Sequence, residues 1–160
     1  MKIGVLSDTH GELACARLAA DVFRAAEVGC VLHCGDIGAD AVVDALAGLP
    51  VHYVFGNCDF DHEGLRCRIE SRQQHCHGMF GSVAIEGINI FFLHGHQAER
   101  FETEIVSGRW QLICSGHTHQ SNLHFRQGTL LLNPGALHRV ARPSVALVDL
   151  PTLEAEIVIL

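Results

Sequence analysis

The sequence lacks several features that mark large classes of proteins. It has seven cysteines, an odd number, and no Cys-x-x-Cys pair among them. No apolar run reaches the roughly 18 residues that a membrane-spanning helix needs. There is no cluster of basic residues, and the formal net charge is −7. We therefore expect reduced thiols, no membrane partner and no tight binding to nucleic acid.

The beginning of the chain also lacks the layout of a secretory signal peptide. An apolar stretch starts at Met1 and leads directly to the acidic Asp8. Together with the reduced cysteines, this predicts an unexported, cytoplasmic protein. Repeats, low-complexity tracts and linkers are absent as well, so we expect one domain that spans residues 1–160.

The apolar periodicity predicts an α/β fold. In the first half, strands and helices alternate. The expected strands there are Lys2–Ser7, Cys30–His33 and Val51–Phe55, and the expected helices are Leu13–Val28, Ala39–Ala47 and part of Asp61–Gln74.

The second half is rich in strands. The expected elements are a hairpin of Met79–Ile85 and Ile88–Leu93, a helix at Ala98–Val106, and strands at Gln111–Ser115, Leu123–Arg126, Thr129–Leu132, Ser144–Asp149 and Glu154–Ile159. Simple doubly wound alternation does not fit this order. We predict a four-layer α/β/β/α sandwich of two mixed β-sheets flanked by helices.

Residues that can bind metals follow five of the apolar strands. Such residues are Asp8, Asp36, Asn57, His94 and His117, and a glycine lies beside each of the last four. Ligands of open α/β sheets bind beyond the carboxyl ends of the strands, so these side chains could converge on one pocket. Glycine at these positions permits close approach of the backbone.

The spacing of the candidate residues suits metal ions. Asp8 and His10 are two residues apart, and so are His117 and His119, so in an extended segment both side chains of a pair leave on the same side. A carboxylate such as Asp36 can bridge two cations with its two oxygens. A mixed oxygen and nitrogen donor set suits manganese, iron, zinc or nickel.

Five motifs in order resemble those of the calcineurin-like metallophosphoesterases, and within them most closely those of the YfcE-type phosphodiesterases. They are Asp8-Thr9-His10, Gly35-Asp36, Gly56-Asn57-Cys58-Asp59, His94-Gly95-His96 and Gly116-His117-Thr118-His119. One such motif alone is a weak signal, whereas five in order at strand exits form a strong one.

The resemblance implies two divalent metal ions, of which we expect manganese first, with nickel, iron or zinc as alternatives. One ion would take Asp8, His10, Asp36 and His119. The other would share Asp36 and add Asn57, His94 and His117. A water or hydroxide between the ions would attack the phosphorus of a small phosphoester, with Asp36, Asn57, Cys58 and Asp59 as the catalytic candidates. Relatives often form dimers or tetramers, so a homo-oligomer is possible.

Cys58 departs from much of the superfamily, which has histidine at this position. That histidine is thought to protonate the leaving group or hold the phosphate, and a thiol is a poorer substitute. The YfcE-type branch has cysteine here too. We therefore predict a preference for diesters or activated leaving groups over alkyl monoesters.

Several other residues near the motifs are expected to support the site or to have ordinary structural roles. Asp59 is expected to hold its loop rather than to react, and His33 and His96 to orient metal ligands. Cys67, His75, Cys76 and His77 match no standard zinc pattern. We expect ordinary roles for the remaining histidines, which are His52, His62, His124 and His138.

Two other functions remain open at this point. A retromer scaffold subunit has the fold that the resemblance implies and uses it to bind proteins, but here all seven predicted ligands are present, which favours catalysis. A phosphomonoesterase is the second alternative. A nucleotide-binding Rossmann domain is disfavoured, because no Gly-x-Gly-x-x-Gly follows the first strand.

Overall fold

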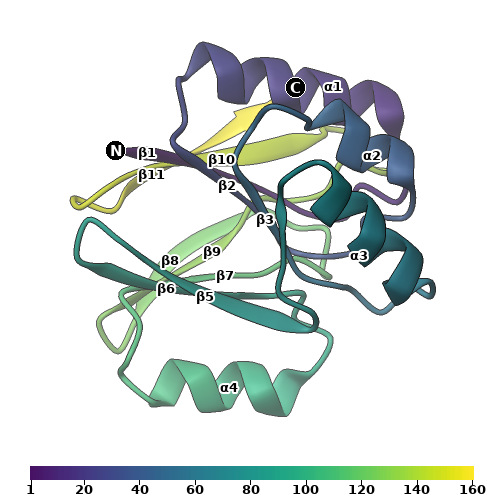
Figure 1. The fold of residues 1–160 in the computed structure, drawn as a ribbon. Coiled ribbons are helices and arrows are strands. Elements are labelled where there is room, and N and C mark those ends of the chain that lie inside the picture. Colours follow the sequence, from purple (N-terminus) through teal and green to yellow (C-terminus); the bar gives the residue numbers. More distant parts are fainter.

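A computed structural model describes all 160 residues and contains two mixed β-sheets packed face to face (Figure 1). The first sheet has six strands, in the spatial order β11 (Glu154–Ile159), β10 (Ser144–Asp149), β1 (Lys2–Leu6), β2 (Cys30–His33), β3 (Val51–Tyr53) and β4 (His75–Cys76). The second has five strands, in the order β5 (Phe80–Ile85), β6 (Ile88–Leu93), β7 (Leu112–Cys114), β9 (Thr129–Asn133) and β8 (Asn122–Arg126).

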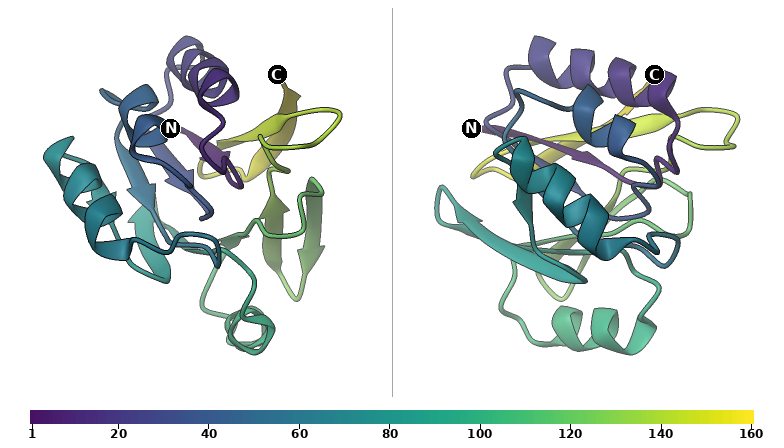
Figure 2. Two further views of the ribbon diagram at one scale, coloured as in Figure 1. Left: turned by 90° about the vertical axis from the view of Figure 1, so that its right-hand side faces the viewer. Right: turned by 45° about the vertical axis from the view of Figure 1, so that its right-hand side comes forward.

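Helices cover the outer face of each sheet. The first sheet is covered by α1 (Leu13–Ala25), α2 (Asp40–Ala45) and α3 (His62–Ser71), and the second by α4 (Ala98–Val106). In both views of Figure 2, α1 and α4 lie at opposite ends of the molecule with the sheets between them. The predicted four-layer α/β/β/α sandwich of two mixed sheets is confirmed. None of the helices is both long enough and apolar enough to cross a bilayer.

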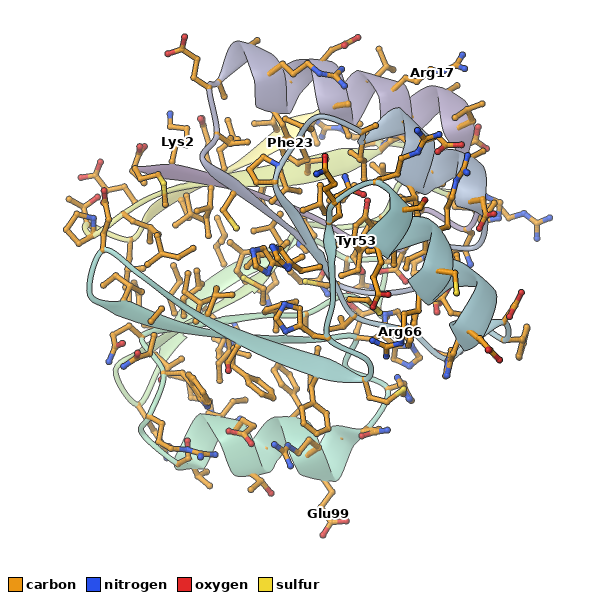
Figure 3. The ribbon with its side chains drawn as sticks, in the orientation of Figure 1. Lys2, Arg17, Phe23, Tyr53, Arg66 and Glu99 are labelled. Carbon is orange, nitrogen blue, oxygen red and sulfur yellow. The ribbon has the colours of Figure 1, made fainter.

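The buried apolar side chains form three clusters, one at each interface between layers. Phe23 of α1 points towards the first sheet, where its ring covers Gly4, while Arg17 points away from it (Figure 3). Phe92 belongs to the cluster between the two sheets, and its neighbour Phe91 packs on the α4 side. Because both faces of the sheets are covered, central strands such as β2, β7 and β9 are buried along their whole length and are mostly apolar.

Strand direction explains why the candidate residues gather at one edge. In the first sheet β1, β2 and β3 are parallel, and in the second β6, β7 and β9 are parallel. The carboxyl ends of parallel strands lie at the same edge of a sheet, so the loops that leave these strands are brought together.

The structure differs from the sequence-based prediction at several boundaries. The first helix ends at Ala25, because Glu27 adopts a positive φ of 51° and the amide of Val28 returns to the carbonyl of Phe23 at 3.1 Å. Val28 lies beyond the helix but still packs into the same core. Its apolar side chain therefore made the helical pattern of the sequence continue past the last helical residue. The two-residue strand β4 was not predicted, because two residues carry no periodicity.

Candidate metal centre

The seven predicted ligands come from loops that leave strands of both sheets. Asp8 and His10 follow β1, Asp36 follows β2, Asn57 follows β3, His94 follows β6, and His117 and His119 follow β7. Contacts between these loops join the two sheets. The Nε2 atom of His94 lies 3.3 Å from Oδ2 of Asp36, and Nε2 of His119 lies 3.1 Å from Oδ1 of Asp8.

Five of the seven residues place their donor atoms in two overlapping groups. Asp8, His10 and His119 offer atoms that lie within 4.8 Å of one another. Asp8, Asp36 and His94 do the same. The first group belongs to the ligand set predicted for the first ion. The second group combines Asp36 and His94, which belong to the set predicted for the other ion, with Asp8.

His117 and Asn57 lie at the rim of this cluster, and both are exposed. The ring of His117 meets that of His94 edge-on, with the ring centroids 5.1 Å apart, and its backbone amide donates to Oδ2 of Asp8 at 3.0 Å. Asn57 precedes Cys58, whose amide donates to Oδ1 of Asp36 at 2.8 Å. Both rim residues are therefore tied through their own loops to the buried carboxylates.

The centre of the cluster is acidic and buried. Asp8 is fully buried and Asp36 is 2% exposed. Oδ1 of Asp8 and the Nε2 atoms of His10 and His94 are buried atoms without a hydrogen-bond partner. Buried charges and polar atoms are costly unless they are paired, and a cation between these atoms would pair them. The residues thus fit divalent metal ions.

A hydrogen bond determines which ring nitrogen of His94 is available as a metal ligand. Its Nδ1 lies 2.9 Å from the carbonyl oxygen of Cys34, and a carbonyl only accepts, so Nδ1 carries the proton. In the neutral ring, Nε2 then presents its lone pair to the two carboxylates. Metal-binding histidines are commonly oriented in this way.

The electrostatics of the cluster favour positive charge. Burial lowers the pKa of His94, but the adjacent carboxylate of Asp36 and the nearby charge of Asp8 raise it more, so its pKa lies above the ordinary value. For Asp36, burial raises the pKa, while the adjacent ring of His94 and the hydrogen bond from the amide of Cys58 lower it further than that. Asp36 is therefore ionised at neutral pH and attracts a cation.

Five of the seven predicted ligands adopt backbone conformations that are rare for residues other than glycine. Their φ angles are positive: Asp8 54°, His10 43°, Asp36 54°, His117 70° and His119 58°. Such conformations are strained in L-residues and persist where surrounding contacts hold them, which happens often at functional sites.

Two glycines allow the loops to approach the carboxylates. A Cβ atom on Gly56 would lie 2.0 Å from Oδ1 of Asp36. One on Gly116 would lie 1.8 Å from Oγ of Ser7 and 2.5 Å from Oδ2 of Asp8. No side chain fits at these distances, so both positions require glycine for steric reasons.

The chain is similar to known proteins in sequence and in fold. The sequence model of the calcineurin-like phosphoesterase superfamily domain matches residues 1–152. The chain belongs to this superfamily. A phosphodiesterase of Methanocaldococcus jannaschii is 30% identical to it over an alignment of 158 residues that covers 93% of each protein.

Solved structures of several other proteins share the fold. The structure of an archaeal phosphodiesterase superposes with a TM-score of 0.94 at 28% identity and covers 100% of both chains. Yfce, a phosphoesterase from E. coli, superposes with a TM-score of 0.73 at 20% identity, over 99% of this chain and 98% of its own. A Vps29 structure from Entamoeba histolytica gives a TM-score of 0.72 at 21% identity, over 100% and 99% of the two chains.

In this superfamily member, several neighbours hold the candidate ligands in place. Asp59 is buried, and its two carboxylate oxygens accept from the amides of Gly38 and Gly56, both at 2.9 Å, so it ties the loop after β2 to the loop after β3. The amide group of the Asn133 side chain donates to the carbonyl of Gly116 at 2.8 Å and so supports the loop of His117.

His33 lies beneath the loop of Asp8 and His10. Its Nε2 is 3.0 Å from the hydroxyl of Thr9, the residue between those two. Burial, together with nearby His94, lowers the pKa of His33 to about 3, so the ring stays neutral. His96 is farther out, with its ring centroid 5.5 Å from that of His94.

His138, for which an ordinary role was expected, borders the candidate metal centre. Its ring centroid lies 5.2 Å from that of His10. The available signal was its place shortly after Asn133-Pro134-Gly135, a segment that resembles a superfamily loop beside the metals.

Proposed function

We propose that residues 1–160 act as one catalytic domain, a phosphodiesterase that works with two divalent metal ions. Asp8, His10 and His119 would hold one ion, and His94, His117 and Asn57 the other, with Asp36 between them. The observation that carries the proposal is the set of buried atoms without partners on Asp8, His10 and His94. Their mixed oxygen and nitrogen chemistry suits manganese first, and also nickel, iron or zinc.

Two divalent ions, when bound, supply Lewis acidity for the phosphate and a more acidic water. The chain itself supplies orientation. The carbonyl of Cys34 fixes the ring of His94, the amide of Cys58 fixes one oxygen of Asp36, and Asp59 holds the two loops together. The strained loops therefore present their donor atoms in one place before substrate arrives.

Cys58 supports a preference for diesters. At neutral pH a diester carries one negative charge, whereas a monoester carries up to two. An imidazolium at this position would balance the second charge, but a neutral thiol does not. The Methanocaldococcus jannaschii relative, which is named as a phosphodiesterase, supports the same preference.

We predict that metal-stripped protein is inactive and that manganese restores hydrolysis of bis(p-nitrophenyl) phosphate. The matched monoester, p-nitrophenyl phosphate, has the same leaving group. Because a charge-assisted hydrogen bond contributes on the order of 1.5–3 kcal/mol, we expect kcat/KM for the diester to exceed that for the monoester by about 10-fold or more. The measurement is a panel of reconstituted metals against both esters and a cyclic phosphodiester.

Faster turnover of the monoester would refute the diester preference and favour the phosphomonoesterase alternative. A metal-loaded protein that hydrolyses no phosphoester at all would instead favour the non-catalytic scaffold.

A further inference from the structure

A cavity of about 310 Å³ lies directly beside the candidate metal centre. Gly38 and Ala39, on the loop between β2 and α2, form one wall together with Asp40, the first residue of α2, and residues 58–61, after β3, form the other. Leu65 of α3 also lines it. We call it the Phe60 cavity.

Cys58 connects this cavity to the metal centre. Cys58 lines the cavity, and its Sγ lies within 4.8 Å of donor atoms of both His10 and Asp36. A phosphate group held at the cluster would therefore have the opening of the Phe60 cavity at its side, within reach of an ester substituent.

Phe60 is a flat apolar side chain in this wall, and it is 91% exposed. Single exposed apolar residues are common on protein surfaces, so the exposure alone indicates nothing. Here the ring belongs to a cavity that adjoins a phosphoesterase site, and an aromatic face in that place can stack on a planar group. The buried Leu65 adds apolar surface.

The charges of the cavity restrict what it can accept. Asp40 and Asp61 are exposed carboxylates in its lining, and no lysine, arginine or histidine lines it. The third carboxylate, Asp59, already accepts hydrogen bonds from two backbone amides. A group that carries a second phosphate or a carboxylate would be repelled, whereas an uncharged ring would not be.

We propose that the Phe60 cavity binds one organic group of the diester substrate and that this group is an uncharged planar ring, as in a nucleoside or an aryl alcohol. The proposal rests on the proposed function, because it takes the phosphate of the diester to sit at the metal cluster. It makes Phe60 a specificity-determining residue.

The test compares two phosphonates of equal charge, phenylphosphonate and methylphosphonate, which the enzyme does not hydrolyse. Their dissociation constants for manganese-loaded protein are measured by calorimetry. Since aromatic stacking contributes on the order of 0.5–1.5 kcal/mol, we expect the phenyl compound to bind about 2- to 10-fold more tightly. Phe60→Ala should remove most of this preference, and Phe60→Tyr should retain it.

Phe125 provides a matched control, because it is 65% exposed on the edge strand β8 and does not line this cavity. Phe125→Ala should leave the preference unchanged. Equal binding of the two phosphonates by wild-type protein, no binding of either, or an unchanged preference in Phe60→Ala would overturn the proposal. Turnover of bis(p-nitrophenyl) phosphate is assayed separately, so a failed ring preference in an active enzyme leaves the proposed function standing.

A second comparison tests the charge argument. We expect the dissociation constant of 4-carboxyphenylphosphonate to be at least about 3-fold higher than that of phenylphosphonate. Asp40→Asn should reduce the difference between the two constants, because it removes one repelling carboxylate. Tighter binding of the carboxylated compound by wild-type protein would contradict the assignment of an uncharged group.

Discussion

Replacing Asp36 by alanine is expected to lower metal-dependent diester hydrolysis by about 1000-fold or more. Changes in residues that merely orient metal ligands typically cost about 10- to 100-fold, and the proposed bridging carboxylate contacts both ions, so its removal should cost more. Asp36 also accepts a hydrogen bond of 2.8 Å from the backbone amide of Cys58. Alanine cannot accept this bond, so the substitution also removes a contact that holds the loop after β3. The measurement is kcat/KM for bis(p-nitrophenyl) phosphate at saturating manganese.

Two further variants separate the loss of a ligand from the loss of structure. Asp36→Asn keeps an acceptor for the amide of Cys58 but removes the negative charge, and it should also be severely impaired. Asp21→Ala removes an exposed carboxylate that pairs only with Arg24 on the outer helix, and its activity should equal that of wild type. If Asp36→Ala folded normally and retained turnover, Asp36 would not be a metal ligand.

Replacing Gly56 by alanine is expected to lower activity by about 100-fold, although the change adds a single methyl group at a residue that is not among the proposed metal ligands. The added Cβ would lie 2.0 Å from Oδ1 and 2.7 Å from Cγ of Asp36, so the carboxylate must move. A displacement of about 1 Å in a catalytic constellation can cost about 100-fold in rate. The apparent manganese affinity should fall together with kcat/KM.

Gly87 in the β5–β6 turn is a suitable control for this variant. A Cβ atom on Gly87 meets nothing within 4 Å, but its φ of 79° strains any other residue. Gly87→Ala should therefore lower stability by about 1 kcal/mol and leave activity unchanged. Wild-type activity in Gly56→Ala would show that the loop yields without moving Asp36, and the steric argument would fail.

Much of the fold could be predicted because both sheets are covered by helices. Strands such as Cys30–His33 and Ile88–Leu93 are mostly apolar, and the structure has them with these same bounds. The boundaries that failed depend on backbone geometry. Glu27 ends the first helix in a left-handed conformation that is usually adopted by glycine, and the sequence carries no glycine there to signal it.

The sequence could predict which residues form the candidate site but not how these residues are arranged. Strand exits pointed to Asp8, Asp36 and His94, whose donor atoms the structure brings within 4.8 Å of one another. The hydrogen bonds that use both oxygens of Asp59 join residues that are 21 and 3 positions away, and no local pattern encodes the longer of these contacts. The contact between the rings of His10 and His138 likewise joins residues that are far apart in the sequence.

X-ray diffraction from crystals grown with manganese, recorded at the manganese absorption edge, tests the central claim most directly. The proposal predicts two anomalous peaks in each chain, one beside His10 and His119 and one beside His94 and His117, with Asp36 in contact with both. A single peak, or peaks that do not contact Asp36, would contradict it.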